Sequence, residues 1–274
     1  MPAFLIGHSY RRFHAWLPFL STVPTQFNTW FVGMKIGGEY EVSMNYQEFQ
    51  KTIAISKEHL YREIYKANRD QIQVKKEETV IRNLSRIFDA ALSISNEKGF
   101  QAMSMRDFSR ETGLSMGALY SYFTSKDELL DMILRQGRLL VLRILDQHIH
   151  PIENPVSKLE TAIRVHIYLS EALQPWFYFS FMEAKNMRPE EKEKTMASEL
   201  YTDQLFADIL KEGQDADLFA PRDADRCAGG IKALLQDWYV KRWKYARSKT
   251  GVDEYADFVV EFVMAYHLLK PIRN

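Results

Sequence analysis

The chain has 274 residues, 46% of them hydrophobic and 26% charged, which is enough to bury a core of one or two domains. Lys and Arg number 36 and Asp and Glu number 36, so net charge does not by itself attract a polyanion. The single cysteine, Cys227, excludes an internal disulfide, and no apolar run reaches membrane-spanning length. We therefore expect a globular, cytoplasmic protein.

Residues 1–33 combine many aromatic residues with proline and show no helical or strand period. Three interpretations stay open: an arm laid on the core, a poorly ordered segment, or a stretch that precedes the true start of translation at Met34. The arginines follow the first apolar residues, which is the wrong order for a signal peptide.

Residues 44–65 repeat part of the later segment 103–124 at a fixed offset of 59 positions. The identical pairs are Met44/Met103, Phe49/Phe108, Ser56/Ser115, Leu60/Leu119 and Tyr61/Tyr120. The earlier segment has Ala54 where the later one has Gly113, and alanine is strained at positive φ. Two interpretations follow: a degenerate helix-turn-helix-like unit within residues 44–68, or two amphipathic helices that are alike by chance.

The charged residues 66–79 contain no proline or glycine. We expect a solvated linker helix there, and the alternative is that its basic residues flank the DNA. A helix over residues 81–99 follows, because Ile81, Leu84 and Phe88 recur at helical spacing and form one apolar stripe.

Three short helical signals lie head to tail in residues 104–131. Ser104 is suited to cap the first helix, with Asp107 three residues later as its reciprocal partner. Gly113 tolerates positive φ, so it predicts the end of that helix and a tight turn.

The second and third helices of this stretch begin at serines. Ser115 can cap the second helix, whose Leu119 and Phe123 lie four residues apart and form a buried stripe. Ser125 can cap the third helix, with Glu128 completing a capping box. Two short helices joined by a glycine turn predict a helix-turn-helix whose second helix can enter a DNA groove.

Several residues of this stretch stand in the order of a known family's motif. They are Gly113-Leu114-Ser115, Leu119-Tyr120, Phe123, Ser125-Lys126 and Leu129-Leu130, after a helix that ends at Lys98-Gly99-Phe100. The pattern closely resembles the DNA-binding motif of TetR/AcrR-type bacterial repressors over roughly residues 80–132. Before Lys75 that family ordinarily has little or nothing. The resemblance implies an N-terminal extension at 1–74, a DNA-binding domain at 75–131 and an effector-binding and dimerisation domain at 132–274.

Larger helices follow the motif. Their apolar spacing and flanking prolines predict helices at 129–149, 156–173, 176–185, 189–212, 223–248 and 252–269. No strand pattern competes, so we expect an all-α fold: a helix-turn-helix domain followed by a larger helical bundle.

The resemblance implies that the helix opening at Ser115 enters the major groove. The candidate DNA-binding residues are Ser104, Met105, Arg106, Ser115, Met116, Gly117, Ala118, Tyr120, Ser121, Tyr122 and Lys126. Tyr120 and Tyr122 can donate hydroxyls to phosphate, and Lys126 is placed as a phosphate clamp. An alternative for Tyr120 is an aromatic that only packs the motif. Because residues 75–130 hold eight basic and eight acidic residues, DNA binding must rest on their arrangement.

An effector pocket and a dimer interface are the other sites that the resemblance implies. The pocket candidates are His166, Tyr168, Trp176, Phe177, Phe179, Met182, Met196 and Tyr201, and they favour an apolar or aromatic effector; any one of them is also explained as core. The dimer candidates are Ile231, Leu235, Trp238, Arg242, Phe258, Phe262 and Tyr266, which lie on the last two predicted helices.

Two other classes of function are considered. Ser95-x-x-Lys98 and Lys249-Thr250-Gly251 echo fragments of a serine β-lactamase signature, but both lie in or beside helices, which disfavours an enzyme. His148-x-His150 has poor spacing for a metal, so neither a metal nor a cofactor is expected. A helical adaptor whose motif packs against protein remains the alternative to a homodimeric repressor of double-stranded DNA that is released by a small-molecule effector. No membrane partner is expected.

Overall fold

The computed structural model describes residues 44–67, 69, 72, 74, 76–184, 187 and 189–268. The interpretations of residues 1–33 and of a start at Met34 therefore fall outside the described residues, as does most of the charged linker.

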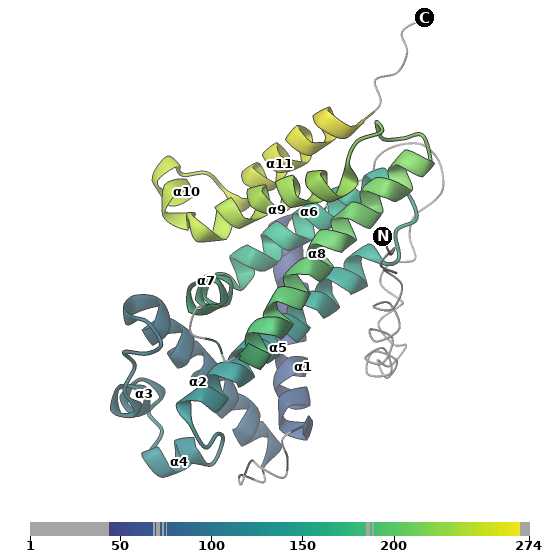
Figure 1. Ribbon diagram of the computed structural model, residues 1–274. Coiled ribbons are helices and arrows are strands. Elements are labelled where there is room, and N and C mark those ends of the chain that lie inside the picture. The colour runs from purple at the N-terminus through teal and green to yellow at the C-terminus, as the bar shows by residue number, and fades with distance from the viewer. Residues whose placement is uncertain are drawn as a thin grey trace, which may run out of the picture. The chain divides into compact units, whose positions relative to one another are not determined.

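Figure 1 shows the described residues as a succession of α-helices. They are α1 (Tyr46–Ala67), α2 (Glu77–Lys98), α3 (Met105–Thr112), α4 (Met116–Tyr120), α5 (Lys126–Ile149), α6 (Pro155–Ala172), α7 (Gln174–Glu183), α8 (Pro189–Asp215), α9 (Ala224–Val240), α10 (Arg242–Ser248) and α11 (Val252–His267). Extended pairing in this part of the chain is limited to one bridge between Phe219 and Leu268. The predicted all-α fold is confirmed.

Residues 46–67 form one uninterrupted helix of 22 residues, α1, which excludes the first of the two interpretations, a helix-turn-helix-like unit within 44–68. Ala54 explains the difference, because alanine favours helix continuation where the later segment has a glycine. The similarity of the two segments reflects amphipathic helices rather than a repeated motif.

Helix α1 contacts α2, which precedes α3 and α4 in the chain, and also α5 and α6, which follow them. Near its start the buried Phe49 ring lies 5.6 Å from the ring of Tyr168 on α6 and 5.7 Å from that of His148 on α5. Near its end Tyr61 packs edge-on against Phe88 of α2, with the ring centroids 5.7 Å apart. Helix α1 is therefore part of the folded core rather than an appended arm.

The prediction of a single helix over residues 223–248 is wrong. The segment forms two helices, α9 and α10, which are separated at Lys241. The break brings Tyr245 back against Trp238, with their ring centroids 4.9 Å apart, and Tyr255 of α11 stacks on the same Trp238 ring at 4.8 Å. This aromatic cluster outweighs the local preference for one continuous helix.

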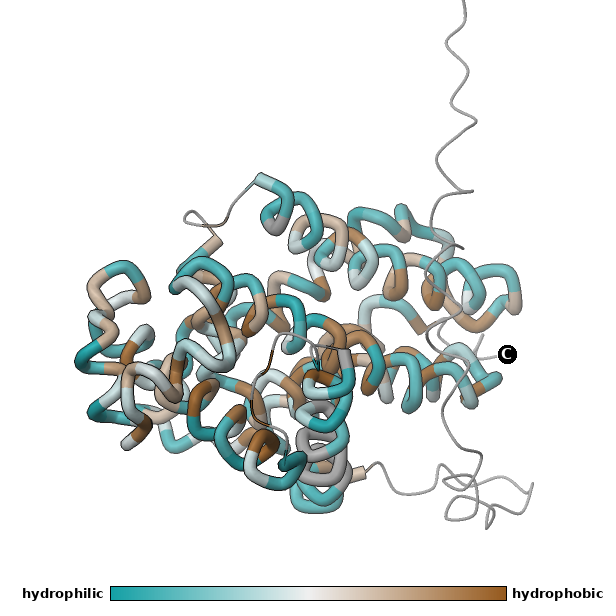
Figure 2. Tube along the Cα trace, turned by 90° about the horizontal axis from the view of Figure 1, so that it is seen from below, coloured by the Kyte–Doolittle hydropathy of each residue, from teal (hydrophilic) through white to brown (hydrophobic). Residues whose placement is uncertain are grey.

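The core of the larger domain lies among α5, α6, α8 and α9. Figure 2 shows hydrophobic residues, in brown, recurring among hydrophilic ones along the described helices. Helix α5 has 24 residues and begins directly after the motif, so it joins the motif to this core. Within the described residues, no helix has the length and apolar character needed to cross a membrane.

Candidate nucleic-acid interface and internal cavity

Three serine caps set the geometry of the motif, as the sequence predicts. The Ser104 hydroxyl accepts from the Asp107 N–H at 3.1 Å, and Ser115 accepts from the Ala118 N–H at 3.2 Å. Ser125 accepts from the Glu128 N–H at 3.1 Å. Each bond satisfies a backbone donor at the start of a helix, so α3, α4 and α5 begin at defined residues.

The turn between α3 and α4 depends on Gly113, which has φ of 63°. Arg86 of α2 donates to the Thr112 carbonyl at this turn. The positive φ favours glycine at this turn, and a methyl group on Gly113 would also stand 2.8 Å from the end of the Arg86 side chain, which would have to shift.

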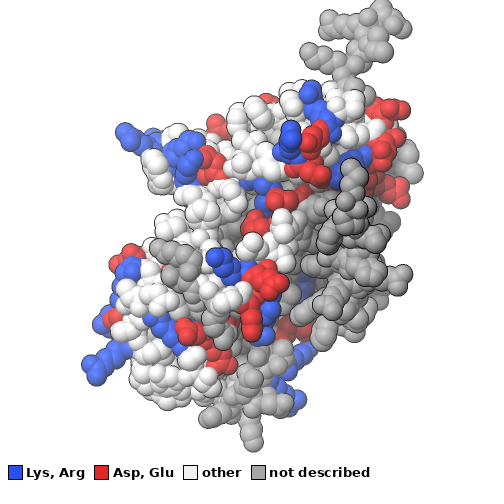
Figure 3. Space-filling model, viewed as in Figure 1, with Lys and Arg blue, Asp and Glu red and all other residues white. Residues whose placement is uncertain are grey.

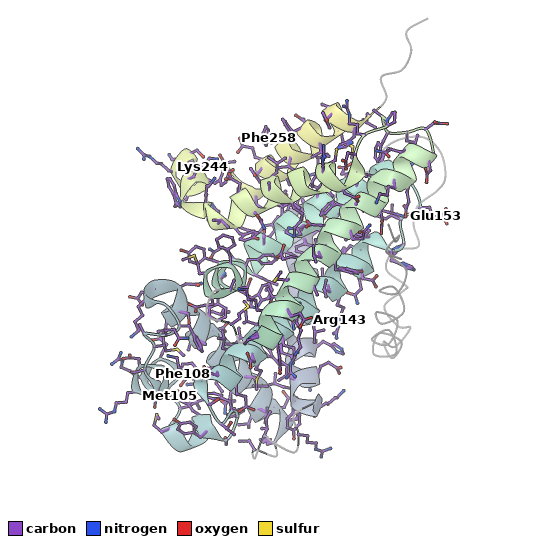
Figure 4. All side chains as sticks on the ribbon, in the orientation of Figure 1. Met105, Phe108, Arg143, Glu153, Lys244 and Phe258 are labelled. Carbon is purple, nitrogen blue, oxygen red and sulfur yellow. The ribbon has the colours of Figure 1, made fainter. Side chains whose placement is uncertain are left out.

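The inner side of the motif is fully packed. Phe108, Leu119 and Phe123 are buried, and the rings of Phe108 and Phe123 lie 6.0 Å apart. Figure 4 labels Phe108 and Met105 on α3. Because these side chains hold α4 from beneath, its opposite face is presented as a rigid surface.

The exposed candidates of this surface are Ser104, Arg106, Ser115, Met116, Gly117 and Tyr120. Met105, Ala118 and Ser121 are half-buried. The Tyr120 side chain is 45% exposed and its ring also touches that of Phe123 at 6.4 Å, so it both packs the motif and reaches solvent.

Tyr122 is 2% exposed, which corrects its prediction as an exposed phosphate donor. Helix α4 ends at Tyr120, and the following turn directs Tyr122 inward, where Asn83 of α2 donates to its hydroxyl at 2.8 Å. Burial raises the pKa of this hydroxyl, which is occupied with positioning α4 on α2.

Lys126 is half-buried and holds the loop that precedes α3. Its ammonium donates to the carbonyls of Gln101 and Met103, both at 2.9 Å, and lies 5.1 Å from the Phe100 ring centre. Burial lowers the pKa of this ammonium. Since an ammonium has three donors, two of them position the loop and one is left for a ligand.

Charges around the motif are mixed, and Figure 3 shows no extended patch of one sign on the face in view. Asp107 binds Lys98 and Arg110, each at 2.8 Å. Hydrogen bonds from Lys98 and Ser104 hold the pKa of the Asp107 carboxyl well below its ordinary value. Arg106, on the same helix, is exposed.

A small cavity of about 40 Å³, partly open to solvent, lies among α5, α6, α7, α8 and α9. Its lining residues are Leu134, Arg138, Val141, His166, Trp176, Phe177, Ser180, Thr195, Ser198, Glu199, Thr202, Lys232 and Tyr239. Three of the predicted pocket residues, His166, Trp176 and Phe177, are therefore brought together.

The other predicted pocket residues lie elsewhere. Tyr168 is buried against α1 and donates its hydroxyl to Asp253 at 2.6 Å, and Phe179 packs on Phe100 with ring centres 5.9 Å apart. Met182, Met196 and Tyr201 are exposed by 44%, 57% and 44%. The apolar sequence of α7 predicts burial on all sides, but this helix lies at the surface and buries one side only.

The polar half of the cavity was missed by sequence reasoning. Lys232 is 6% exposed, and its ammonium lies 3.0 Å from the Glu199 carboxylate. The sequence does hold a sign that Lys232 is buried. Lys232 lies in the apolar stripe of α9, four residues after Ala228 and three before Leu235. A charge at such a position needs a partner from another helix, and the sequence does not say which.

His166 is fully buried in the same wall, and its Nδ1 makes no hydrogen bond within the described part of the chain. Burial, with the nearby Lys232 charge, lowers the pKa of this imidazole well below its ordinary value. The ring is therefore neutral near pH 7.

The predicted dimer residues divide into two groups. Ile231, Leu235 and Trp238 are buried in the core of the monomer, which corrects their placement at an interface. Arg242 binds Glu171 at 2.9 and 3.0 Å. The exposed residues are Phe258, Phe262 and Tyr266 of α11, of which Phe258 is labelled in Figure 4.

Helix α9 also presents two small residues to solvent. Gly229 and Gly230 are exposed, and a methyl group added to either would meet no atom within 4 Å. Glycine inside a helix lowers its stability. Because these two glycines have no side chains, another helix could approach the surface of α9 closely at this point.

Two family models match the chain. The model described as bacterial regulatory proteins of the tetR family matches residues 87–133, and the model described as the tetracyclin repressor-like C-terminal domain matches residues 153–266. The first spans most of α2 through the start of α5, and the second spans α6 to α11. Helix α1 lies outside both.

Similar proteins are regulators of the same kind. The HTH-type transcriptional regulator BetI of Rhizobium meliloti is 27% identical over 160 residues, which cover 57% of this chain and 75% of BetI. A tetR-family regulatory protein from Rhodococcus RHA1 has a TM-score of 0.61 at 22% identity, covering 67% of this chain and 95% of that one. AibR, solved in complex with isovaleryl coenzyme A and operator DNA, has a TM-score of 0.57 at 19% identity. The match covers 66% of this chain and 97% of AibR.

The order of the two matched models, the capped helix-turn-helix and the helical domain that follows it agree with one another. The family consists of transcription regulators and not of enzymes. The chain belongs to the TetR family of bacterial regulatory proteins and is a helix-turn-helix transcription regulator.

Proposed function

We propose that this chain is a homodimeric, ligand-released repressor that sets α4 in the major groove at each half of an inverted-repeat operator. The observation that carries the proposal is the outer face of α4, where Ser115, Met116, Gly117 and Tyr120 are exposed while Leu119 is fully buried beneath them. AibR supports it, since that protein holds a small-molecule ligand and operator DNA in a similar fold.

Each contact has a chemical basis. Gly117 has open space around its Cα, so the backbone can approach the bases closely. The exposed Tyr120 hydroxyl can donate to phosphate, and the third N–H of Lys126 can do the same beside the capped start of α5. Arg106 can reach a base or a phosphate from α3. Ser104 and Ser115 contribute mainly as helix caps. Tyr122 does not contact DNA but holds α4 against α2 through its hydrogen bond with Asn83.

Two copies are required, because one short helix contacts too few bases for useful affinity. Phe258, Phe262 and Tyr266 are exposed on α11, and Gly229 and Gly230 are exposed on α9 with no atom within 4 Å of an added methyl group. An isologous pairing of α9 and α11 would cover both features at once. We therefore place the dimer interface on the outer faces of these helices.

Selection of duplexes from a random DNA pool tests the function directly. We expect enrichment of an inverted repeat whose half-sites lie about one helical turn apart or a multiple of it. Binding to the selected duplex should weaken as salt rises, since cations are released from the phosphates. Failure to enrich any duplex would contradict the proposal and favour a helical adaptor.

Substitution of Arg106 and Tyr120 tests the interface. Arg106→Ala and Tyr120→Ala should each weaken binding to the selected duplex by about five- to 150-fold, which corresponds to about 1–3 kcal/mol per contact. Arg247→Ala, an exposed arginine on α10, is the matched control and should leave binding unchanged. Equal losses in Arg106→Ala and Arg247→Ala would point to a general charge effect rather than to a contact made from α3.

Sedimentation tests the dimer. Phe262→Asp places a charge in the centre of the proposed interface and should give a monomer. Phe181→Asp, also at an exposed phenylalanine but on α7, should leave the oligomeric state as it is. If the Phe262→Asp variant is still a dimer, the interface does not lie on this face of α11.

A further inference from the structure

The internal cavity has a chemistry that identifies the class of its ligand. We propose that the small molecule sensed by this regulator is a carboxylic acid with an apolar body, and that its carboxylate replaces Glu199 as the partner of Lys232. The inference rests on the proposed function, because it assigns the chemistry of the effector in that scheme.

Lys232 and Glu199 are unequal partners. The Lys232 side chain is 7% exposed, whereas the Glu199 side chain is 52% exposed. Glu199 can therefore turn into solvent with little loss, but Lys232 remains inside the protein and needs a negative charge beside it. A ligand carboxylate that enters the cavity can supply that charge. Glu199 holds the place of the ligand in the unbound protein.

His166 offers a second polar contact. Its Nδ1 lacks a hydrogen-bond partner within the described residues although the ring is fully buried and lines the cavity. A neutral imidazole carries one N–H donor, and in the tautomer protonated at Nδ1 it can donate to a second ligand oxygen. A buried polar group without a partner is costly, so a ligand oxygen at this place stabilises the bound state.

The charges and walls of the cavity select the sign and shape of the ligand. Arg138 and Lys232 line it against Glu199, so a cationic ligand would face two like charges. The rest of the wall includes Trp176 and Phe177, whose rings lie edge to face with centres 5.2 Å apart. This wall suits an aromatic or acyl body and refines the expectation of an apolar effector by adding an acidic group.

The size of the cavity connects binding to movement. A volume of about 40 Å³ holds about three water molecules, so a larger ligand must push its walls outward. The Trp176 ring already rests on α5: its indole N–H donates to the Ile133 carbonyl at 3.1 Å, and a methyl group on Gly137 would overlap it. Displacement of Trp176 therefore acts on α5, the helix that begins at the motif.

The experiment uses acids paired with neutral and cationic analogues. Benzoate, hexanoate and octanoate are each compared with the primary amide of the same body, and benzyltrimethylammonium serves as the cationic probe. We expect acids to raise the thermal midpoint of the full chain and to release the duplex selected from the random pool. The amides and the ammonium compound should do neither. Amides or the ammonium compound that act as well as the acids, or a panel in which no acid acts, would overturn the inference.

Two substitutions with opposite expected effects separate recognition from folding. Lys232→Met should lower the affinity for acids by at least about tenfold. Glu199→Gln should raise it, because the competitor for Lys232 loses its charge. Lys192→Met, an exposed lysine on α8, is the matched control and should change nothing. A loss of acid binding in both Lys232→Met and Glu199→Gln, or in neither, would contradict the assignment.

The duplex assay keeps this inference apart from the proposed function. If no duplex is bound, the repressor proposal fails whatever the acids do. If the selected duplex is bound and is released by a neutral or cationic compound, the repressor proposal stands and the carboxylate assignment fails.

Discussion

The helix-turn-helix and the internal cavity are held together by interactions of different range. In the motif, the serine caps join residues three positions apart: Ser104 to Asp107, Ser115 to Ala118 and Ser125 to Glu128. In the cavity, Lys232 meets Glu199 from another helix, and Trp176 bonds to a carbonyl 43 residues away. Local bonds therefore set where each helix of the motif begins, whereas the cavity exists only when five helices are packed.

The two regions meet at α5. Its first turn is capped at Ser125 and carries Lys126 against the motif, and further along it Gly137 supports the Trp176 ring. A change at the cavity can thus reach the motif through one helix, and substitutions in either region show how strongly the two are coupled.

The largest expected effect is loss of packing beneath α4. Phe108→Ala removes a fully buried ring and should lower the free energy of unfolding by about 3–5 kcal/mol, with loss of DNA binding. Denaturant unfolding measures it. Phe181→Ala, at a ring that is 47% exposed, is the control and should cost much less. If the two variants lose the same stability, the motif is not packed as described.

A methyl group at Gly137 tests the cavity side. Gly137→Ala overlaps the Trp176 ring and should lower the free energy of unfolding by about 1–3 kcal/mol while weakening the response to ligand. Gly117→Ala adds the same methyl group where no atom lies within 4 Å and should raise stability by about 0.5–1 kcal/mol. Two changes of the same sign would contradict the contact between Trp176 and α5.

The buried imidazole of His166 should contribute to the pH dependence of the free energy of unfolding. The pKa of His166 is lowered in the folded state, so below pH of about 6.5 the unfolded chain binds a proton that the folded chain does not. Its contribution to stability is present above that pH and is lost as the pH falls, by up to about 1.4 kcal/mol per pH unit. His166→Gln should reduce this slope between pH 7 and 5, as measured by unfolding at each pH. An unchanged slope would mean that the ring takes up a proton while folded.

The smallest expected effect belongs to a single cap. Ser115→Ala should lower the free energy of unfolding by about 1 kcal/mol, because the Ala118 N–H loses its acceptor. Its effect on DNA binding should be larger than this stability loss suggests, since α4 has only five residues. Ser93→Ala, at an exposed serine on α2, is the control for removing a hydroxyl. Equal losses would show that the cap does not hold α4.

Sequence reasoning was accurate where neighbours along the chain decide the structure. The caps at Ser104, Ser115 and Ser125 and the turn at Gly113 were predicted, since each depends on residues within one or two helical turns. It failed where distant residues decide. Burial of Tyr122 depends on Asn83, and the aromatic cluster around Trp238 breaks a segment whose own pattern predicts one helix.

The amino-acid sequence by itself determined that the chain is helical and where its DNA-binding motif begins and turns, because capping, glycine conformation and apolar spacing are local properties. Only the tertiary structure decided which aromatic residues meet at the cavity, that Lys232 is buried there beside Glu199 and His166, and which sides of α9 and α11 face solvent. The physical reason is that a helical stripe shows how many residues are buried, but not which partner buries them.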